Sequence, residues 1–237
     1  MSKNERFNTL KTNLNKSSFY KLDCSLNQVE IEELFPLIYI YVIAGFSAID
    51  VNCNPDLVIL AKESILKAIK ESYKFNENIE NEPFLFISCF SSELIKKDIL
   101  DLENNLRSCQ INGAEIFELH IDDINFDLLK EKLLLVKKIF NAKPISINLS
   151  RNKLSNARII ELIKFFKFNI QKEIIIEVDG SEKNNNENYN NTLQTISTAD
   201  IINKQLIKKE IAFSRLPILL SGGTNYLTLE LAKECNV

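Results

Sequence analysis

Hydrophobic and polar residues follow two different periods along the chain. Short apolar runs rich in Ile, Val, Phe and Leu predict buried β-strands, because parallel strands covered on both faces read as continuous apolar segments. These runs occupy residues 19–24, 48–53, 84–90, 115–121, 145–150, 173–179 and 217–221. Longer segments between them carry an apolar residue every three or four positions, which predicts helices over residues 29–44, 55–73, 92–109, 126–140, 156–168, 193–212 and 227–235.

The regular alternation of strand and helix predicts an α/β fold with a parallel sheet. Seven consecutive βα units favour a TIM-type (β/α) barrel, and no clear eighth strand follows them, so the barrel is expected to be incomplete. A dinucleotide-binding sheet would carry a glycine-rich turn after its first strand, and residues 24–28 contain no glycine. We therefore predict one barrel-like domain over residues 19–237, preceded by a polar, disordered tail over residues 1–18.

Helix-terminating and helix-initiating residues lie where this pattern requires them. Gly45 and Gly113 each follow a helical segment and precede a strand, a position that favours left-handed backbone geometry. Asn54 and Pro55 supply an N-cap and a first helical residue. These residues support the predicted boundaries.

Net charge and hydropathy exclude several classes of protein. The 237 residues carry a net charge of −3, which gives no bulk electrostatic reason to bind nucleic acid. The longest apolar stretch, residues 34–46, is too short to span a bilayer, and residues 1–18 lack the apolar core of a signal peptide. We expect a cytoplasmic protein without a membrane span or a nucleic-acid partner.

The cysteine and histidine content argues against a metal site. The five cysteines lie at positions 24, 53, 89, 109 and 235 and form no CxxC pair, which disfavours a disulfide framework or a zinc finger and favours a reducing compartment. His120 is the sole histidine, so a multi-histidine site is excluded, and we expect it to be a hydrogen-bonded residue at a strand end. No metal is predicted.

Carboxylates near the carboxyl ends of two predicted strands are the candidate acid–base residues. Asp50 alternates with apolar neighbours, and so do Glu177 and Asp179, so these side chains lie on one polar face of their strands. In a TIM-type barrel the strand ends carry the active site, and clustered carboxylates serve acid–base work or bind a cation. Alternatively, they cap helices, accept hydrogen bonds from loop amides, or pair with lysines such as Lys21.

A glycine-rich turn ends the last predicted strand. Two glycines at a strand end let backbone N–H groups approach an anion without interference from Cβ atoms, and barrels hold phosphate in the loops after strands seven and eight. Alternatively, the glycines only make the turn. The candidate ligand-binding residues are Ser221, Gly222, Gly223, Thr224 and Asn225.

Several of these segments resemble a known family. They are YKLDC at 20–24, AGFSAIDV at 44–51, NPD at 54–56, AEIFELH at 114–120, VDG at 178–180 and GGTN at 222–225. Together they resemble the cyanobacterial light-dependent period protein family, LdpA. A plastid-encoded barrel-like family shares the alanine-glycine turn and the asparagine-proline helix start, but it lacks the GGTN match.

The LdpA resemblance implies a cyanobacterial, cytoplasmic regulatory protein. Members of that family carry iron–sulfur clusters, give redox and light input to the circadian clock, and associate with clock or redox proteins. The family's cysteine-rich insert would follow residues 84–90, where Ser91, Ser92 and Glu93 open a helix instead. A [4Fe–4S] cluster needs about four closely spaced thiolates. We therefore predict an LdpA-like scaffold without the cluster and without any other cofactor.

Two functions follow from these patterns. The first is a regulatory or interaction protein of the LdpA type, which would not be an enzyme. The alternative is a barrel enzyme or sensor that binds a small phosphorylated, anionic metabolite, with Gly222 and Gly223 at the phosphate and Asp50 or Asp179 in acid–base roles. The pattern places no lysine or histidine of obvious catalytic type beside these carboxylates, which favours the first function.

Overall fold

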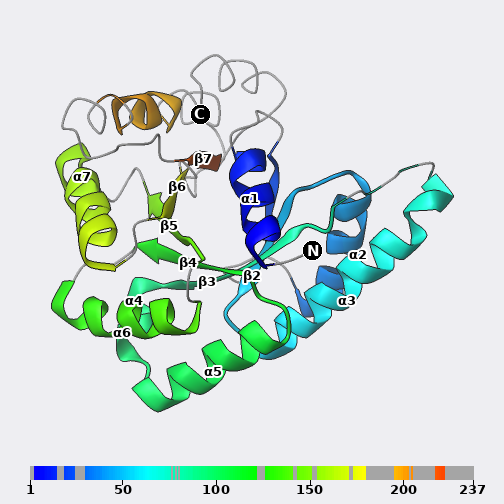
Figure 1. The fold of residues 1–237 in the computed structure, drawn as a ribbon, viewed down its shortest axis with the longest axis horizontal. Helices are drawn as coiled ribbons and strands as arrows, with labels where there is room; N and C mark the ends of the chain where they lie inside the picture. Colours follow the sequence, from blue (N-terminus) through cyan, green and yellow to red (C-terminus); the bar gives the residue numbers. More distant parts are fainter. Residues whose placement is uncertain are drawn as a thin grey trace. The chain divides into compact units, whose positions relative to one another are not determined.

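The computed structural model describes residues 3–14, 19–24, 30–75, 77, 79, 81–121, 126–140, 143–150, 154–170, 173–179, 195–202, 204 and 217–221. Its strands are β1 (Lys21–Asp23), β2 (Ala48–Asn52), β3 (Phe84–Phe90), β4 (Ile116–Ile121), β5 (Ile145–Ser150), β6 (Ile174–Asp179) and β7 (Ile218–Ser221). The order of the strands in the sheet is their order along the chain (Figure 1). A doubly wound sheet would reverse its order at a switch point, so this order is that of a TIM-type barrel and confirms the predicted fold class.

The helices follow the strands as the sequence pattern predicts, with one division. The described helices are α1 (Lys3–Leu14), α2 (Ile31–Ile43), α3 (Pro55–Glu71), η1 (Ser72–Phe75), α4 (Ser91–Lys96), α5 (Ile99–Ile111), α6 (Phe126–Ile139), α7 (Asn156–Phe165), the π-helical turn η2 (Phe166–Ile170) and a helix over residues 195–202. The predicted helix 92–109 is two helices, because Asp98 adopts an extended conformation and caps α5 by accepting a hydrogen bond from Leu100 N at 2.7 Å. The predicted helix 227–235 lies outside the described residues.

The chain divides into two compact units. Unit 1 comprises Met1–Cys89, Glu93–Glu118 and Leu134–Lys143. Unit 2 comprises Phe90–Ser92, Leu119–Leu133 and Pro144–Val237. The single domain over residues 19–237 stays a prediction.

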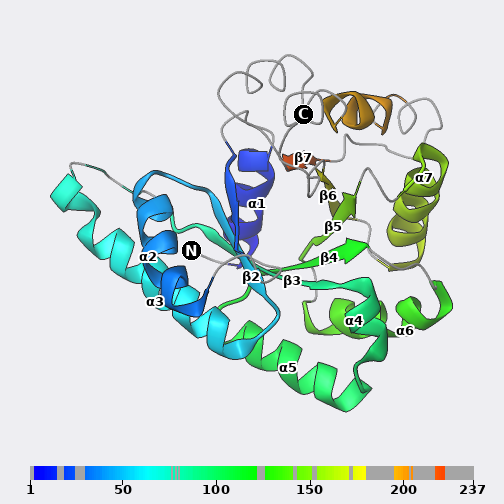
Figure 2. The same cartoon turned by 180° about the vertical axis from the view of Figure 1, so that it is seen from behind.

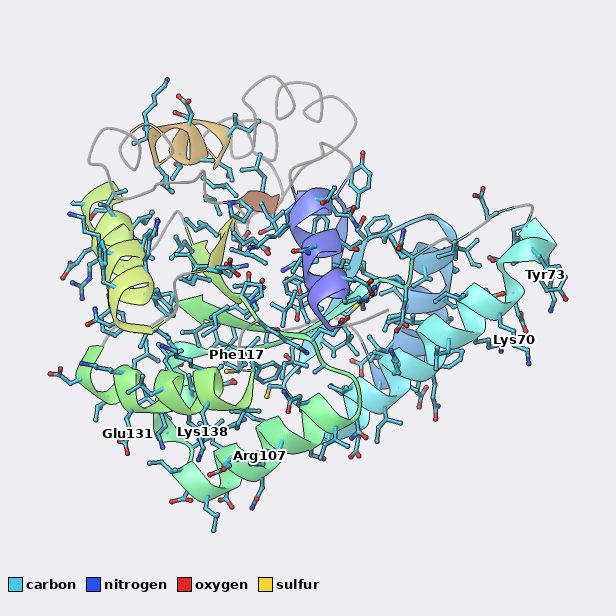
Figure 3. The ribbon with its side chains drawn as sticks, viewed as in Figure 1. Lys70, Tyr73, Arg107, Phe117, Glu131 and Lys138 are labelled. Carbon is cyan, nitrogen blue, oxygen red and sulfur yellow. The ribbon has the colours of Figure 1, made fainter. Side chains whose placement is uncertain are left out.

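Unit 1 holds β1, β2 and most of β3, with helices α2, α3 and α5. Neighbouring strands pair in parallel, with Asp23 opposite Asp50 and Asp50 opposite Phe86. Helix α3 packs against α2, α5 and β2 (Figure 1). Phe117 at the start of β4 is fully buried, with its ring centroid 6.3 Å from that of Phe140 (Figure 3). Alternate strand residues therefore form an apolar core, and the intervening residues of β1 and β2 form a polar face.

Residues Lys3–Leu14 form helix α1 (Figure 2). The prediction of a disordered tail over residues 1–18 is therefore wrong for this segment. Leu10 is buried, and the Arg6 guanidinium donates to Glu115 Oε1 and Oε2, both at 2.8 Å. Arg6 also donates to the backbone oxygens of Glu82 at 2.6 Å and Pro83 at 2.9 Å. The acceptors precede β3 and β4, so α1 is anchored at the amino ends of these strands. Residues 1–18 show little apolar periodicity, so the sequence pattern did not predict the helix that Arg6 attaches to the strands.

Unit 2 holds β5, β6 and β7 with α7 and the helix over residues 195–202. The strands pair in parallel, with Asn148 opposite Glu177 and Asp179 opposite Ser221. Their intervening residues are buried and apolar, among them Ile147. The strands of unit 2 therefore have one polar face and one apolar face, as the strands of unit 1 do.

The predicted turn residues have the expected geometry. Gly45 and Gly113 adopt φ of 88° and 114°, the left-handed region that favours glycine. Asn54 caps α3, since its side chain accepts a hydrogen bond from Asp56 N at 2.9 Å. In the described part of the chain, no helix is both long and apolar enough to cross a membrane.

Candidate functional site

A buried ion-pair cluster lies on the polar face of unit 1. Lys21 Nζ, on β1, lies 2.8 Å and 2.9 Å from the two carboxylate oxygens of Glu118, on β4. The same nitrogen lies 3.9 Å from Asp50 Oδ2, on β2. The Lys21 side chain is 7% exposed and both carboxylates are 0% exposed. We call Lys21, Asp50 and Glu118 the buried charge cluster.

The buried charge cluster is costly to form. Removing an ion from water costs several kcal/mol even after relaxation, and an apolar trio of similar size is often equally stable. The Phe86 ring, with its centroid 5.4 Å from Lys21 Nζ, adds a cation–π contact to the ammonium. With one cation and two carboxylates, the cluster carries a formal charge of −1. Stability alone gives little reason for this arrangement, which makes it the main functional candidate of unit 1.

The strand register places further polar residues on this face. Asn52 lies opposite Ser88 in the β2–β3 pair, two residues beyond the Asp50 level. Ser88 is 1% exposed, and its Oγ makes no hydrogen bond to any of the described residues. A buried hydroxyl of this kind can donate to or accept from a bound molecule. The polar face thus continues from the charge cluster toward the carboxyl ends of β2 and β3.

Unit 2 holds the other two predicted carboxylates. Glu177 on β6 is buried and accepts a hydrogen bond from Asn148 Nδ2, on β5, at 3.0 Å. Asp179 is half-buried at the end of β6. His120 is buried at the end of β4, with its ring centroid 5.6 Å from that of Phe90. The alternation of polar and apolar residues on β6 is confirmed, while the catalytic roles of Glu177 and Asp179 stay predictions.

Asp50 is located where the sequence predicts, and the structure supplies the partner that the pattern did not. Of the alternatives given for this residue, pairing with Lys21 is the one that the structure shows. Glu118 was missed, although it shows the same signal as Asp50, since it stands between the buried apolar residues Phe117 and Leu119. Strand periodicity alone could have identified it.

Within unit 1, a carboxylate oxygen of Asp23 lies within 4.8 Å of one of Asp50, a pair that could contribute to a metal site. The Lys21 ammonium lies between the carboxylates of Glu118 and Asp50. The absence of a metal and of a cofactor stays a prediction. Gly222, Gly223, Thr224 and Asn225 lie outside the described residues, and of the predicted ligand-binding turn only Ser221, at the end of β7, is described.

The electrostatics of unit 1 act on Cys24, which follows β1. Burial raises the pKa of the Cys24 thiol to about 12, and the negative charges of Asp23 and Asp50 contribute to the rise. Deprotonation would add a third negative charge beside these two. Cys24 is therefore expected to be an inert thiol rather than a nucleophile.

This pKa predicts the reactivity of Cys24 toward iodoacetamide. At pH 8 about one Cys24 side chain in ten thousand would be a thiolate, so alkylation should be roughly a thousandfold slower than in the urea-unfolded chain. The alkylation rate of the folded protein should rise about tenfold per pH unit up to at least about pH 10. The alkylation rate of the unfolded chain should already have levelled off near that pH. Mass spectrometry of the Cys24 peptide after timed quenching measures both rates. Equal rates in the folded and unfolded chains would contradict the prediction.

Comparison with solved structures identifies the fold. The chain is similar to deoxyribose phosphate aldolase from Aeropyrum pernix, with a TM-score of 0.60 and 11% identity over 99% of this chain and 91% of that chain. A protein named as a deoxyribose-phosphate aldolase from Coccidioides immitis gives a TM-score of 0.62 at 10% identity, with the same coverage. Another so named, from Toxoplasma gondii, gives 0.57 at 12% identity, covering 95% of each chain. At these identities the likeness establishes the fold, an α/β TIM-type barrel.

These comparisons overturn the LdpA resemblance. The similar solved structures are barrels of the deoxyribose-phosphate aldolase kind, and neither a protein-family profile nor a curated protein sequence matches the chain. The LdpA identification is wrong, and the circadian, cyanobacterial and clock-partner expectations that depended on it have no support. The matching segments are short, three to eight residues each.

Proposed function

We propose that the chain is a barrel enzyme that binds a small phosphorylated sugar. The observation that carries this proposal is the buried charge cluster of Lys21, Asp50 and Glu118, whose ionised groups are costly to bury. The polar face that holds it continues toward the carboxyl ends of β2 and β3, and barrels build their sites at the carboxyl ends of their strands. Solved barrels of similar fold are named as aldolases of deoxyribose phosphate, which supports a sugar phosphate as the ligand class.

The cluster favours proton transfer over covalent catalysis by lysine. A lysine that attacks a carbonyl must be neutral, whereas Lys21 is held between two carboxylates as an ammonium. Lys21 is the only lysine within the seven described strands. We assign it to donating a hydrogen bond or a proton, and Asp50 to accepting one, at a hydroxyl or carbonyl group of the sugar.

Unit 2 offers its own acid–base candidates. Glu177 is held in one orientation by Asn148, which is the kind of support that a catalytic carboxylate needs. Asp179 is more exposed and ends its strand. We propose Glu177 and Asp179 as additional acid–base residues, a role that the hydrogen bond from Asn148 supports for Glu177.

The proposed phosphate contact is the turn that begins at Ser221. Gly222 and Gly223 permit backbone N–H groups to approach an anion, and loops after late barrel strands commonly hold phosphate. The negative formal charge of the buried charge cluster disfavours phosphate there, so a separate anion contact is required. The proposed ligand-binding residues are Ser221, Gly222, Gly223, Thr224 and Asn225.

A thermal-shift screen with sugars and their phosphates tests the proposal. A phosphorylated ligand at about one hundred times its Kd should stabilise the fold by about 2.7 kcal/mol, which raises the Tm by several degrees. Gly223→Asp should lose this shift, since it adds a side chain and a negative charge at the turn. Asn104→Asp, which adds the same charge at an exposed position of α5, should retain it. No shift with any phosphorylated sugar, or an undiminished shift in Gly223→Asp, would reject the proposal.

A further inference from the structure

Two cysteines of unit 1 share one hydrogen-bond acceptor. Cys53 directly follows β2, and its Sγ lies 3.2 Å from Asn105 Oδ1. Cys109 Sγ, one helical turn from Asn105 on α5, lies 3.7 Å from the same oxygen. Both thiols are buried, at 8% and 0% exposure. Strand and helix thus bring together two sulfurs that are far apart in the sequence.

The two thiols differ in chemical character. When Cys53 loses its proton, the S–H of Cys109 can donate to the Cys53 sulfur in place of Asn105, and this hydrogen bond lowers the pKa of Cys53. Burial opposes this change, and the positive charge of Lys97 assists it. The same hydrogen bond, together with burial, raises the pKa of Cys109. Cys53 is therefore the more nucleophilic thiol, and Cys109 is a protonated neighbour whose sulfur lies beside the same Asn105 oxygen.

We propose that Cys53 and Cys109 form a reversible redox pair that closes to a disulfide when the protein meets a hydroperoxide. The Cys53 thiolate attacks the terminal peroxide oxygen, the O–O bond breaks, and a sulfenic acid forms as the leaving oxygen takes a proton. The Cys109 sulfur then attacks the Cys53 sulfur, the S–O bond breaks, and water leaves with the Cys109 proton. The peroxide gains two electrons and the two thiols lose them.

The bond would tie the carboxyl end of β2 to α5. Cys53 follows Asn52, the last residue of β2, and its backbone N–H donates to Ser88 O at 2.8 Å. A covalent link from this position to α5 restricts the unfolded chain, so the oxidised protein should unfold at a higher temperature than the reduced protein. The inference does not depend on the proposed function, since it concerns only thiol chemistry within unit 1.

Peptide mapping after treatment with hydrogen peroxide tests the proposal. Cleavage after glutamate places Cys24, Cys53, Cys89, Cys109 and Cys235 in separate peptides. The folded protein, treated with one equivalent of peroxide, should yield a Cys53–Cys109 linked peptide that dithiothreitol removes. The linked peptide should be lost in Cys109→Ser and retained in Cys89→Ser, a matched change at another buried cysteine.

The wild-type map alone decides the outcome if Cys109→Ser does not fold. A Cys53 that stays reduced would overturn the proposal, as would one that accumulates as sulfinic acid or links mainly to Cys24 or Cys89. A peptide link that survives Cys109→Ser would overturn it as well.

Discussion

Replacing Lys21 by methionine is expected to lower the free energy of unfolding by about 3–5 kcal/mol, because it leaves two buried carboxylates without their cation. Glu118 would lose both of its short contacts to Lys21 Nζ, and Asp50 would lose the positive charge that lies 3.9 Å from its Oδ2. Denaturant unfolding at pH 7, followed by circular dichroism, measures the change. We expect this to be the largest effect of any single substitution in the buried charge cluster.

Two further variants separate the electrostatic effect from the packing effect. Adding Glu118→Gln to Lys21→Met removes one of the two buried negative charges and should recover part of the lost stability. Lys138→Met is the matched control, because Lys138 is 68% exposed and lies 4.0 Å from Glu103. It should change the stability by no more than about 0.5 kcal/mol. A Lys21→Met effect as small as that of Lys138→Met would contradict the described ion pairs.

Replacing Arg6 by alanine should lower the free energy of unfolding by about 2–4 kcal/mol. This effect is large for a residue in a segment with little apolar periodicity. The substitution removes a two-pronged contact to Glu115 and leaves the Glu82 and Pro83 carbonyls without their donor. The guanidinium carbon also lies 4.0 Å from the centroid of the Phe84 ring. The same denaturant unfolding experiment measures the loss.

The geometry of the guanidinium is central to this prediction. Arg6→Lys should restore only a minor part of the stability, because an ammonium cannot form the same fork of hydrogen bonds. Arg107→Ala is the matched control, since Arg107 is 47% exposed on α5 and pairs with Glu103 on its own helix (Figure 3). A loss of less than about 1 kcal/mol is expected there. If Arg6→Ala and Arg107→Ala behaved alike, the anchoring of α1 would be disproved.

The fold could be predicted from the sequence because strand and helix periods are local signals. All seven described strands lie within two residues of the predicted limits. Gly45 and Asn54 marked a helix end and a helix start through backbone geometry that few other residues satisfy. Helix α1 was missed because its position depends on contacts of Arg6 with residues more than seventy positions away.

The candidate site could be predicted only in part. Asp50 was identified from its alternation with apolar neighbours, and Glu118 shows the same alternation. The pairing of Lys21 with Glu118 could not be read from the chain, because it joins residues 97 positions apart across strands β1 and β4. Short matching segments led to the wrong family, because scattered matches of three to eight residues are weak evidence of ancestry.

Calorimetric titration with deoxyribose phosphate and with unphosphorylated deoxyribose tests the proposed function most directly. We expect saturable binding of the phosphorylated sugar, at least about tenfold tighter than that of the unphosphorylated one, which corresponds to about 1.4 kcal/mol from the phosphate contact. Gly223→Asp should abolish the difference between the two ligands. Equal affinities for both sugars in the unmodified protein, or no binding of either, would contradict the account.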